Sequence, residues 1–139
     1  MSQRTNEADI AALTETVRTY YDGMMAGDAA KLGRAFHPRA CIVGNEQGEL
    51  YWATLDEFVA ECEQGVAHAG PHEWRIEALS FEGDTALVRF VSQYAGVWYS
   101  DDLSMLRIDD AWRIVHKTFY ARPGTDVDEL CSGTGLLVI

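Results

Sequence analysis

The most regular hydrophobic pattern of the chain lies in its second half, over residues 85–120. Three apolar runs of strand length follow one another there, separated only by short breaks at residues 95–96 and 109–110. Turns this short can join only antiparallel neighbours. The pattern therefore predicts a three-stranded antiparallel meander with strands of about ten residues, longer than the usual 5–6. Long antiparallel strands curl, so we expect a curved sheet whose inner side is filled by other elements.

The N-terminal half of the chain carries the helical spacing that can fill this inner side. Apolar residues recur every three or four positions over residues 10–24, which predicts one buried stripe of a helix that ends at Gly27. Asp28 is placed to cap a second, short helix. We expect this helix to stop at His37, because Pro38 disfavours helical geometry in the residue before it.

Two short strands and a third helix are predicted next. Residues 40–43 and 49–52 have strand character, and the glycine-containing segment 44–48 between them is typical of a turn. Thr54 and Glu57 have the spacing of a capping box, which predicts the start of a helix. From His72 onward apolar and polar residues alternate, so we expect a further strand with one face exposed to solvent.

Helices in the first part and mostly strands afterwards predict an α+β fold, with the helices on one face of the sheet. We expect one domain over residues 1–122 and a C-terminal tail over residues 123–139. The tail ends in four apolar residues, 136–139, which would dock on the domain, cover a pocket mouth, join a partner subunit or remain unstructured.

Composition narrows the possible partners. The 139 residues include 22 acidic and 11 basic side chains, a net charge of −11, which argues against nucleic acid and anionic membranes as partners. Three cysteines without a CxxC pair indicate neither a disulfide framework nor a zinc site. The N-terminus lacks the apolar segment of a signal peptide, and no apolar run reaches the roughly 18 residues of a membrane span. We therefore expect a cytoplasmic protein.

No motif indicates a metal or a cofactor. His68 and His72 are four residues apart, but Gly70 and Pro71 between them break any helix that would bring them together. The glycine-rich motifs for dinucleotides and phosphates, the HExxH motif and the GxSxG motif are missing from the sequence. We expect any activity to need neither metal nor cofactor.

Several short segments of the sequence resemble a known superfamily in their residues, their order and their spacing. Over residues 8–120 the chain resembles the nuclear transport factor 2-like fold, within it the SnoaL-like proteins and most closely the group called putative lumazine-binding. The segments that carry the resemblance are Tyr20–Gly23, Gly27–Asp28, Phe36–Ala40, Tyr99–Leu103 and Asp110–Phe119. The resemblance implies a cone-shaped, strongly curved, mostly antiparallel sheet wrapped around three N-terminal helices, with an apolar pocket inside. It also implies a homodimer formed through the outer face of the sheet.

Aromatic side chains are frequent where such a pocket would lie. An aromatic-lined cone suits a flat or cyclic, mostly apolar ligand. The same residues could equally be ordinary core, because aromatic side chains bury a large apolar area. The candidate ligand-binding residues are Tyr20, Phe36, Trp52, Phe58, Tyr94 and Tyr99.

Two side chains are candidates for acid–base chemistry. Alternation places Asp101 on the same face as the apolar Leu103 and places Asp102 on the other. An enclosed Asp101 would have a raised pKa and could abstract a proton beside a carbonyl group. The same alternation groups His116 with Ile114, where it would act as an acid or base near neutral pH. The alternatives are solvated or arginine-paired aspartates and a structural histidine.

Three functions fit these observations. The first is a noncatalytic module that binds a small, mostly apolar ring compound. The second is a cofactor-independent isomerase, cyclase or dehydratase that uses Asp101 and His116. The third is a dimeric interaction domain whose interior is filled by side chains. An open cavity with an inward Asp or His would favour the second, and an open cavity without one would favour the first.

Overall fold

The computed structural model describes residues 5–124 and confirms the α+β class. Most of the predicted tail, including the apolar residues 136–139, lies outside the described residues. The described elements are α1 (Asn6–Ala26), α2 (Ala29–Ala35), β1 (Phe36–Glu46), β2 (Glu49–Thr54), α3 (Leu55–Gln64), the 3-10 turn η1 (Val66–His68), β3 (Trp74–Glu82), β4 (Thr85–Tyr94), β5 (Val97–Ile108) and β6 (Ala111–Ala121).

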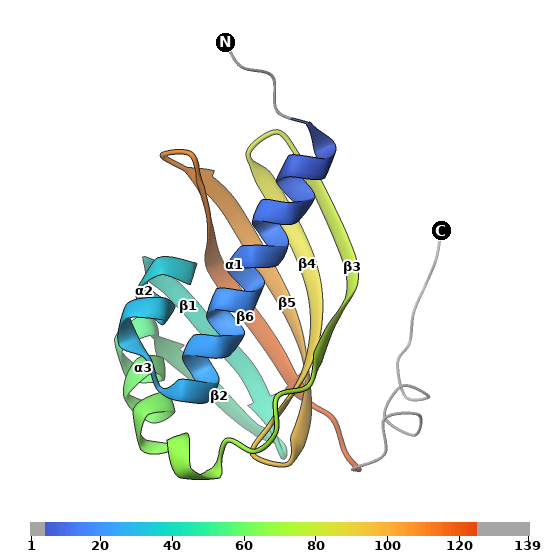
Figure 1. The fold of residues 1–139 in the computed structure, drawn as a ribbon. Helices are drawn as coiled ribbons and strands as arrows, with labels where there is room; N and C mark the ends of the chain where they lie inside the picture. Colours follow the sequence, from blue (N-terminus) through green and yellow to red (C-terminus); the bar gives the residue numbers. More distant parts are fainter. Residues whose placement is uncertain (1–4, 125–139) are drawn as a thin grey trace.

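The strands form one mixed sheet in the order β2-β1-β6-β5-β4-β3. The predicted meander is confirmed as β4, β5 and β6, which pair antiparallel. The pairs β1–β2 and β3–β4 are also antiparallel, while β1 pairs with β6 in parallel. Figure 1 shows the strands bending behind α1, with α2 and α3 near β1 and β2. The predicted curved sheet around three helices is therefore confirmed.

The predicted C-terminal end of α1 and the predicted start of α3 agree with the structure. Thr5 caps α1 by accepting a hydrogen bond from the Ala8 N–H, and Gly27 ends the helix with a positive φ of 60°. The capping box at the start of α3 is present, because the Thr54 hydroxyl accepts from the Glu57 N–H and the Glu57 carboxylate accepts from the Thr54 N–H. None of the helices described combines the length and the apolar character that a membrane crossing requires.

The second helix is shorter than predicted. It ends at Ala35, two residues before His37, and β1 begins directly at Phe36 with an extended backbone (φ −103°, ψ 147°). The pairing of β1 with β6 shifts register between Phe36 and Cys41, which brackets Pro38. Proline lacks an N–H to donate, so an irregular part of a strand tolerates it. Pro38 therefore interrupts the ladder of a strand rather than ending a helix.

The turn between β1 and β2 is also shorter than the predicted segment 44–48. Positive φ angles at Gln47 (53°) and Gly48 (86°) place the turn there, and both strands extend further than predicted. Gly44 lies within β1 and pairs with Phe119 of β6. A Cβ at Gly44 would lie 2.6 Å from atoms of the Phe119 ring. Glycine at this position thus permits a close approach of an aromatic ring to the strand, a role that its sequence context does not distinguish from a turn.

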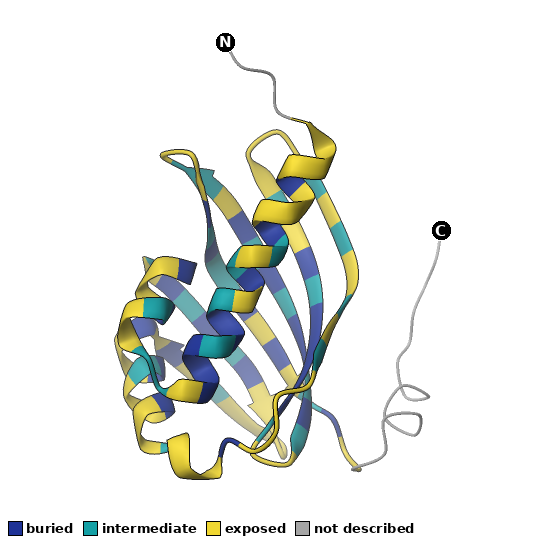
Figure 2. Cartoon of the chain, viewed as in Figure 1, coloured by how far each residue is buried: buried dark blue, intermediate teal, exposed yellow. Residues whose placement is uncertain are grey.

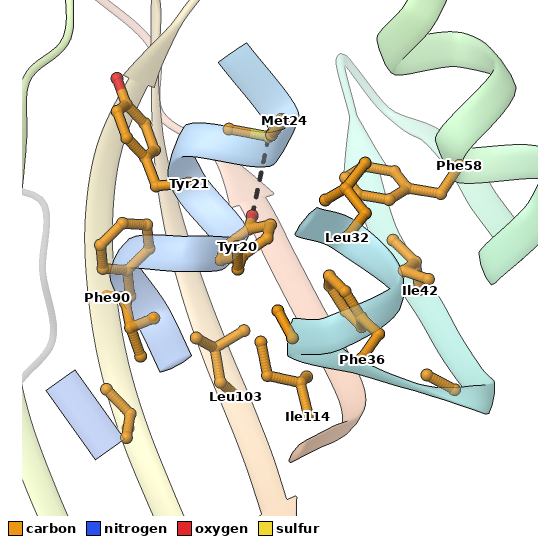
Figure 3. Close-up of a cluster of buried hydrophobic side chains, with 14 of the residues drawn as sticks. Tyr20, Tyr21, Met24, Leu32, Phe36, Ile42, Phe58, Phe90, Leu103 and Ile114 are labelled. Carbon is orange, nitrogen blue, oxygen red and sulfur yellow. Dashed lines mark hydrogen bonds between the residues drawn. The ribbon is translucent and has the colours of Figure 1, made fainter. Parts of the chain in front are cut away.

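The core lies between α1 and the concave face of the sheet. In Figure 2 the buried positions of α1 follow one side of the helix, as its apolar stripe predicted. Figure 3 shows Tyr20 between Phe36 and Phe90, and its ring centroid lies 5.3 Å from that of Phe36 and 5.8 Å from that of Phe90. Such edge-to-face pairs contribute about 0.5–1.5 kcal/mol each beyond area burial. These rings fix the position of α1 over the sheet.

Tyr21, the next residue of α1, links the helix to the part of the sheet formed by β3 and β4. Its buried hydroxyl donates to the Gln93 carbonyl of β4 at 2.7 Å and accepts from the Glu73 N–H, before β3, at 3.1 Å. One side chain therefore joins a helix, a strand and the segment leading into the neighbouring strand.

Replacing Tyr21 by Phe keeps the ring and removes both hydrogen bonds. We expect the Tyr21→Phe variant to lose about 1–3 kcal/mol of unfolding free energy in urea titrations, since each bond is worth about 0.5–1.5 kcal/mol. Tyr120→Phe is the matched control, because Tyr120 is 53% exposed and should change stability little. Equal losses in the two variants would contradict this account of Tyr21.

Candidate functional site

A cavity of about 130 Å³ lies between α1, α3 and the inner face of the sheet. Six of the thirteen residues that line it are aromatic, a composition that suits a ring compound. Every strand except β3 contributes to it. The residues that line the cavity are Tyr20, Met24, Glu46, Tyr51, Phe58, Glu61, Cys62, Ser92, Tyr94, Tyr99, Asp101, Lys117 and Phe119.

The polar groups of the cavity fall into an inner and an outer set. Asp101 and Lys117 are buried, whereas Glu46 and Glu61 are exposed and mark the side open to solvent. The hydroxyl of Tyr99 donates to Glu46 at 2.9 Å, and the hydroxyl of Tyr51 donates to Glu61. These pairs hold two aromatic rings at the entrance and give it negative charge.

Asp101 is a fully enclosed carboxylate. Its side chain is 1% exposed, and its Oδ2 accepts a hydrogen bond from the Tyr20 hydroxyl at 2.8 Å. Its Oδ1 has no hydrogen-bond partner within residues 5–124. Burial raises the pKa of Asp101, while Lys117 and the Tyr20 hydroxyl act to lower it. Asp102 lies on the other side of the sheet, where its carboxylate is 3.3 Å from Arg89, so alternation along β5 identified the inward aspartate.

A β-bulge in β6 decides which of its polar side chains reaches the cavity. His116 pairs with Ser104 and Ile114 pairs with Met105, which leaves Val115 as an extra residue without a partner in β5. The extra residue reverses the alternation. Ile114 before the bulge and Lys117 after it are both buried. Regular alternation of inward and outward residues would place His116 on the same face as Ile114. Because the bulge reverses this alternation, Lys117 points inward instead of His116.

Lys117 extends from this bulge into an aromatic cage. Its side chain is 6% exposed, and Nζ lies 4.5 Å from the ring centroid of Phe58, 4.8 Å from that of Tyr20 and 5.4 Å from that of Phe119. A cation over aromatic faces is stabilised by the ring quadrupoles, by about 2 kcal/mol or more when desolvated. Nζ is also 3.9 Å from Asp101 Oδ2. Sequence reasoning missed Lys117, because only the bulge brings it to the interior.

Of the remaining candidate residues, some line the cavity and one lies in the core. Tyr20, Phe58, Tyr94 and Tyr99 line the cavity with Asp101. Phe36 packs in the core against Tyr20 and Phe58 and is not part of the wall.

Two predicted site residues lie away from the cavity. Trp52 is 67% exposed, because its neighbour Tyr51 takes the inward position in β2. His116 lies within 3.3 Å of the Thr118 hydroxyl on the outer side of β6. The pairing of Asp101 with His116 in one cavity is therefore corrected to Asp101 with Lys117.

The remaining reactive groups of the cavity are held neutral. Burial raises the pKa of the Cys62 thiol to about 11, so it is not a thiolate near neutral pH. Burial, with Asp101 next, raises the pKa of Tyr20, which therefore keeps its hydroxyl proton. Within the described residues, no three His, Cys, Asp or Glu side chains are grouped so as to hold a metal ion. Near neutral pH, Tyr20 is therefore a hydrogen-bond donor and Cys62 is not an activated nucleophile.

The raised pKa of Asp101 predicts how stability depends on pH. Folded Asp101 holds its proton more tightly than an unfolded aspartate, whose pKa is about 3.9. The resulting stability is fully present below the unfolded pKa and is lost as pH rises through the folded pKa. In denaturant titrations from acid to neutral pH, we expect the unfolding free energy of wild type minus that of Asp101→Asn to fall with rising pH. A difference that stays constant would contradict the buried placement.

The chain is similar to several known proteins. A crystal structure of an NTF-2 like protein of unknown function from Silicibacter pomeroyi is 37% identical, with a TM-score of 0.82 over 86% of this chain and 100% of that one. An NTF2-like protein of unknown function from Shewanella baltica has a TM-score of 0.80 at 18% identity, covering 88% of this chain and 100% of that one. The aldolase FrzH of Cladobotryum sp is 25% identical over 131 residues, 88% of this chain and 99% of that protein.

The family comparison covers most of the described fold. The family model described as "Putative lumazine-binding" matches residues 8–120, from α1 to the end of β6. This range contains every residue that lines the cavity. The chain therefore belongs to the putative lumazine-binding family of nuclear transport factor 2-like proteins.

Proposed function

We propose that the protein binds a compact, ring-containing carbonyl compound in the cavity and that Asp101 takes a proton from it. The observation that carries this proposal is the buried carboxylate of Asp101, hydrogen-bonded to Tyr20, at the wall of an aromatic-lined cavity. The presence of a cavity supports a role in ligand binding over one in which side chains fill the interior.

The size of the cavity limits the ligand. An engineered apolar cavity of about 150 Å³ in another protein binds benzene. The 130 Å³ present here thus suits one ring with small substituents. A two-ring compound such as lumazine, which the family description names, would need side chains at the entrance to move. Tyr51 and Tyr99 are the side chains placed to do so, because their hydroxyl groups are held by glutamates at the exposed rim while their rings pack against Phe119.

The inner polar groups support proton transfer. A carboxylate whose pKa is raised by burial is a stronger base than an exposed one, and it can abstract a proton from carbon beside a carbonyl. The enolate that results is an anion, and the Lys117 ammonium 3.9 Å from Asp101 is the positive group nearby that would stabilise it. The step begins isomerase, cyclase, dehydratase and aldol reactions alike. The relative that bears the name aldolase is consistent with this class.

Binding without reaction is the second candidate. Asp101 already accepts a hydrogen bond from the Tyr20 hydroxyl and faces Lys117, so the three groups could serve only as a structural ion-pair network. In that case the aromatic walls bind the ligand and the polar groups only orient it. Deuterium exchange separates the two functions, because a binding module need not exchange a ligand proton.

Exchange of a proton beside the carbonyl tests the proposal. We expect the protein to accelerate deuterium incorporation from D₂O into a monocyclic ketone such as cyclohexanone, followed by NMR, and the Asp101→Asn variant to lose this acceleration while still binding the ketone. Asp102→Asn is the matched control, because Asp102 lies on the outer face and should leave the rate unchanged. Binding without exchange in the wild type would leave the binding module as the function.

Homodimer formation through the outer face of the sheet stays a prediction. This face carries the exposed large apolar side chains of the strands, which alternate with inward residues. They are Leu50, Trp52, Leu87, Leu106 and Tyr120. Sedimentation should give about twice the chain mass of 15.5 kDa, and Trp52→Glu should shift it toward the single chain. A wild-type mass of one chain would contradict the dimer. The cytoplasmic location also stays a prediction.

A further inference from the structure

The buried lysine offers chemistry that proton transfer by Asp101 alone does not require. We infer that Lys117 is a nucleophile that forms a covalent imine with an aldehyde or ketone bound in the cavity. The inference rests on the proposed ligand site and deepens it, because it assigns the ligand to the class of reactive carbonyl compounds. The observation that supports this inference is the position of the Lys117 Nζ atom in the cavity wall.

The amine is held where a carbonyl compound would meet it. Lysine is almost never buried unless it is paired. The nearest acidic atom, Asp101 Oδ2, is 3.9 Å away, beyond the roughly 2.7–2.9 Å of a charge-assisted hydrogen bond. Within residues 5–124 the contacts of Nζ are this ion pair and the three surrounding rings, with no hydrogen bond donated by its three N–H groups. Nζ therefore stands at the cavity wall without the hydrogen bonds that would fix it in a purely structural role.

The surroundings favour attack by the amine. The rings of Phe58, Tyr20 and Phe119 surround Nζ, and the Lys117 side chain is only 6% exposed, so it has little contact with bulk water. Desolvation in an apolar site is a recognised way to activate a lysine for imine formation. Asp101 supplies the base, since its buried carboxylate can accept a proton from the ammonium across the 3.9 Å gap. Water exclusion also protects an imine from hydrolysis.

The step balances without any further reactant. The Lys117 ammonium gives one proton to Asp101, and the neutral nitrogen forms a bond to the carbonyl carbon as the C=O π bond breaks. Asp101 returns the proton to the alkoxide oxygen, which gives a carbinolamine whose nitrogen still carries the positive charge. That nitrogen then gives a second proton to Asp101, which passes it to the hydroxyl group, and the nitrogen lone pair expels water to form the iminium directly. Ammonium and carbonyl thus become iminium and water.

This covalent step would make the proposed proton abstraction easier. A positively charged iminium withdraws electrons from the adjacent carbon more strongly than a carbonyl group does, so the neighbouring C–H becomes more acidic. Asp101, which is beside Lys117, is then placed to take that proton. One lysine and one aspartate would activate the carbonyl compound and deprotonate it in sequence.

The chain provides its own internal control. It contains only two lysines, Lys31 and Lys117. Lys31 lies in α2, is partly exposed and is not among the residues that line the cavity. Any adduct can therefore be assigned to the cavity, to an amine outside it or to the N-terminus by peptide mapping.

Reductive trapping tests the inference. The full chain is incubated with benzaldehyde and cyanoborohydride, and adducts are mapped by mass spectrometry over time. We expect Lys117 to be modified before Lys31 and the N-terminal amine, and this preference to be lost in urea. Lys117→Arg keeps the positive charge and should lose the cavity adduct, whereas Lys31→Met should retain it. Asp101→Asn should slow the trapping.

The outcomes distinguish this inference from the proposed function. Circular dichroism and benzaldehyde binding, measured by NMR, show whether each variant is folded and whether the probe enters the cavity. Binding in the wild type with trapping at Lys117 no faster than at Lys31 would overturn the imine and leave ligand binding intact. Ketone exchange that persists in Lys117→Arg would likewise overturn the imine while Asp101 remains the base. Absence of probe binding in the wild type would overturn both proposals.

Discussion

The site depends on one extra residue in β6. Val115 has no partner in β5, and from that point the alternation of inward and outward side chains is reversed. Without it, the side chains of the last strand would exchange faces beyond Ile114, and His116 rather than Lys117 would take the inward position opposite Leu103. The bulge is thus what combines a cation and a carboxylate in the same cavity.

Bringing these two charges together inside an apolar wall has a physical cost. Removing each ion from water costs several kcal/mol, and an ion pair at 3.9 Å offsets it only in part. The Tyr20 hydroxyl and the aromatic faces around Nζ contribute the rest of the stabilisation. Replacing the pair by packed apolar residues would often be neutral or favourable for stability. A pair that contributes so little to stability is consistent with the chemistry proposed for it.

Local signals in the sequence predicted most of the fold. The breaks at Ala95-Gly96 and Asp109-Asp110, the cap at Thr54 and the helix end at Gly27 are short-range features, and each lies where expected. Asp101 was identified because β5 alternates regularly around it. The features that the sequence did not predict depend on pairing between strands. They are the bulge opposite Met105, the ring of Phe119 over Gly44 and the outward position of Trp52. Periodicity within one segment does not contain that information.

The bulge directs Lys117, and not His116, into the cavity. Selective ¹³C labelling of lysine would test this, since it gives only two sets of side-chain NMR signals, from Lys31 and Lys117. We expect the Lys117 Hε protons to be shifted upfield by the surrounding rings and to show NOEs to Phe58 and Tyr20. Lysine signals that are both unshifted, together with NOEs from the His116 ring to Phe58, would contradict it.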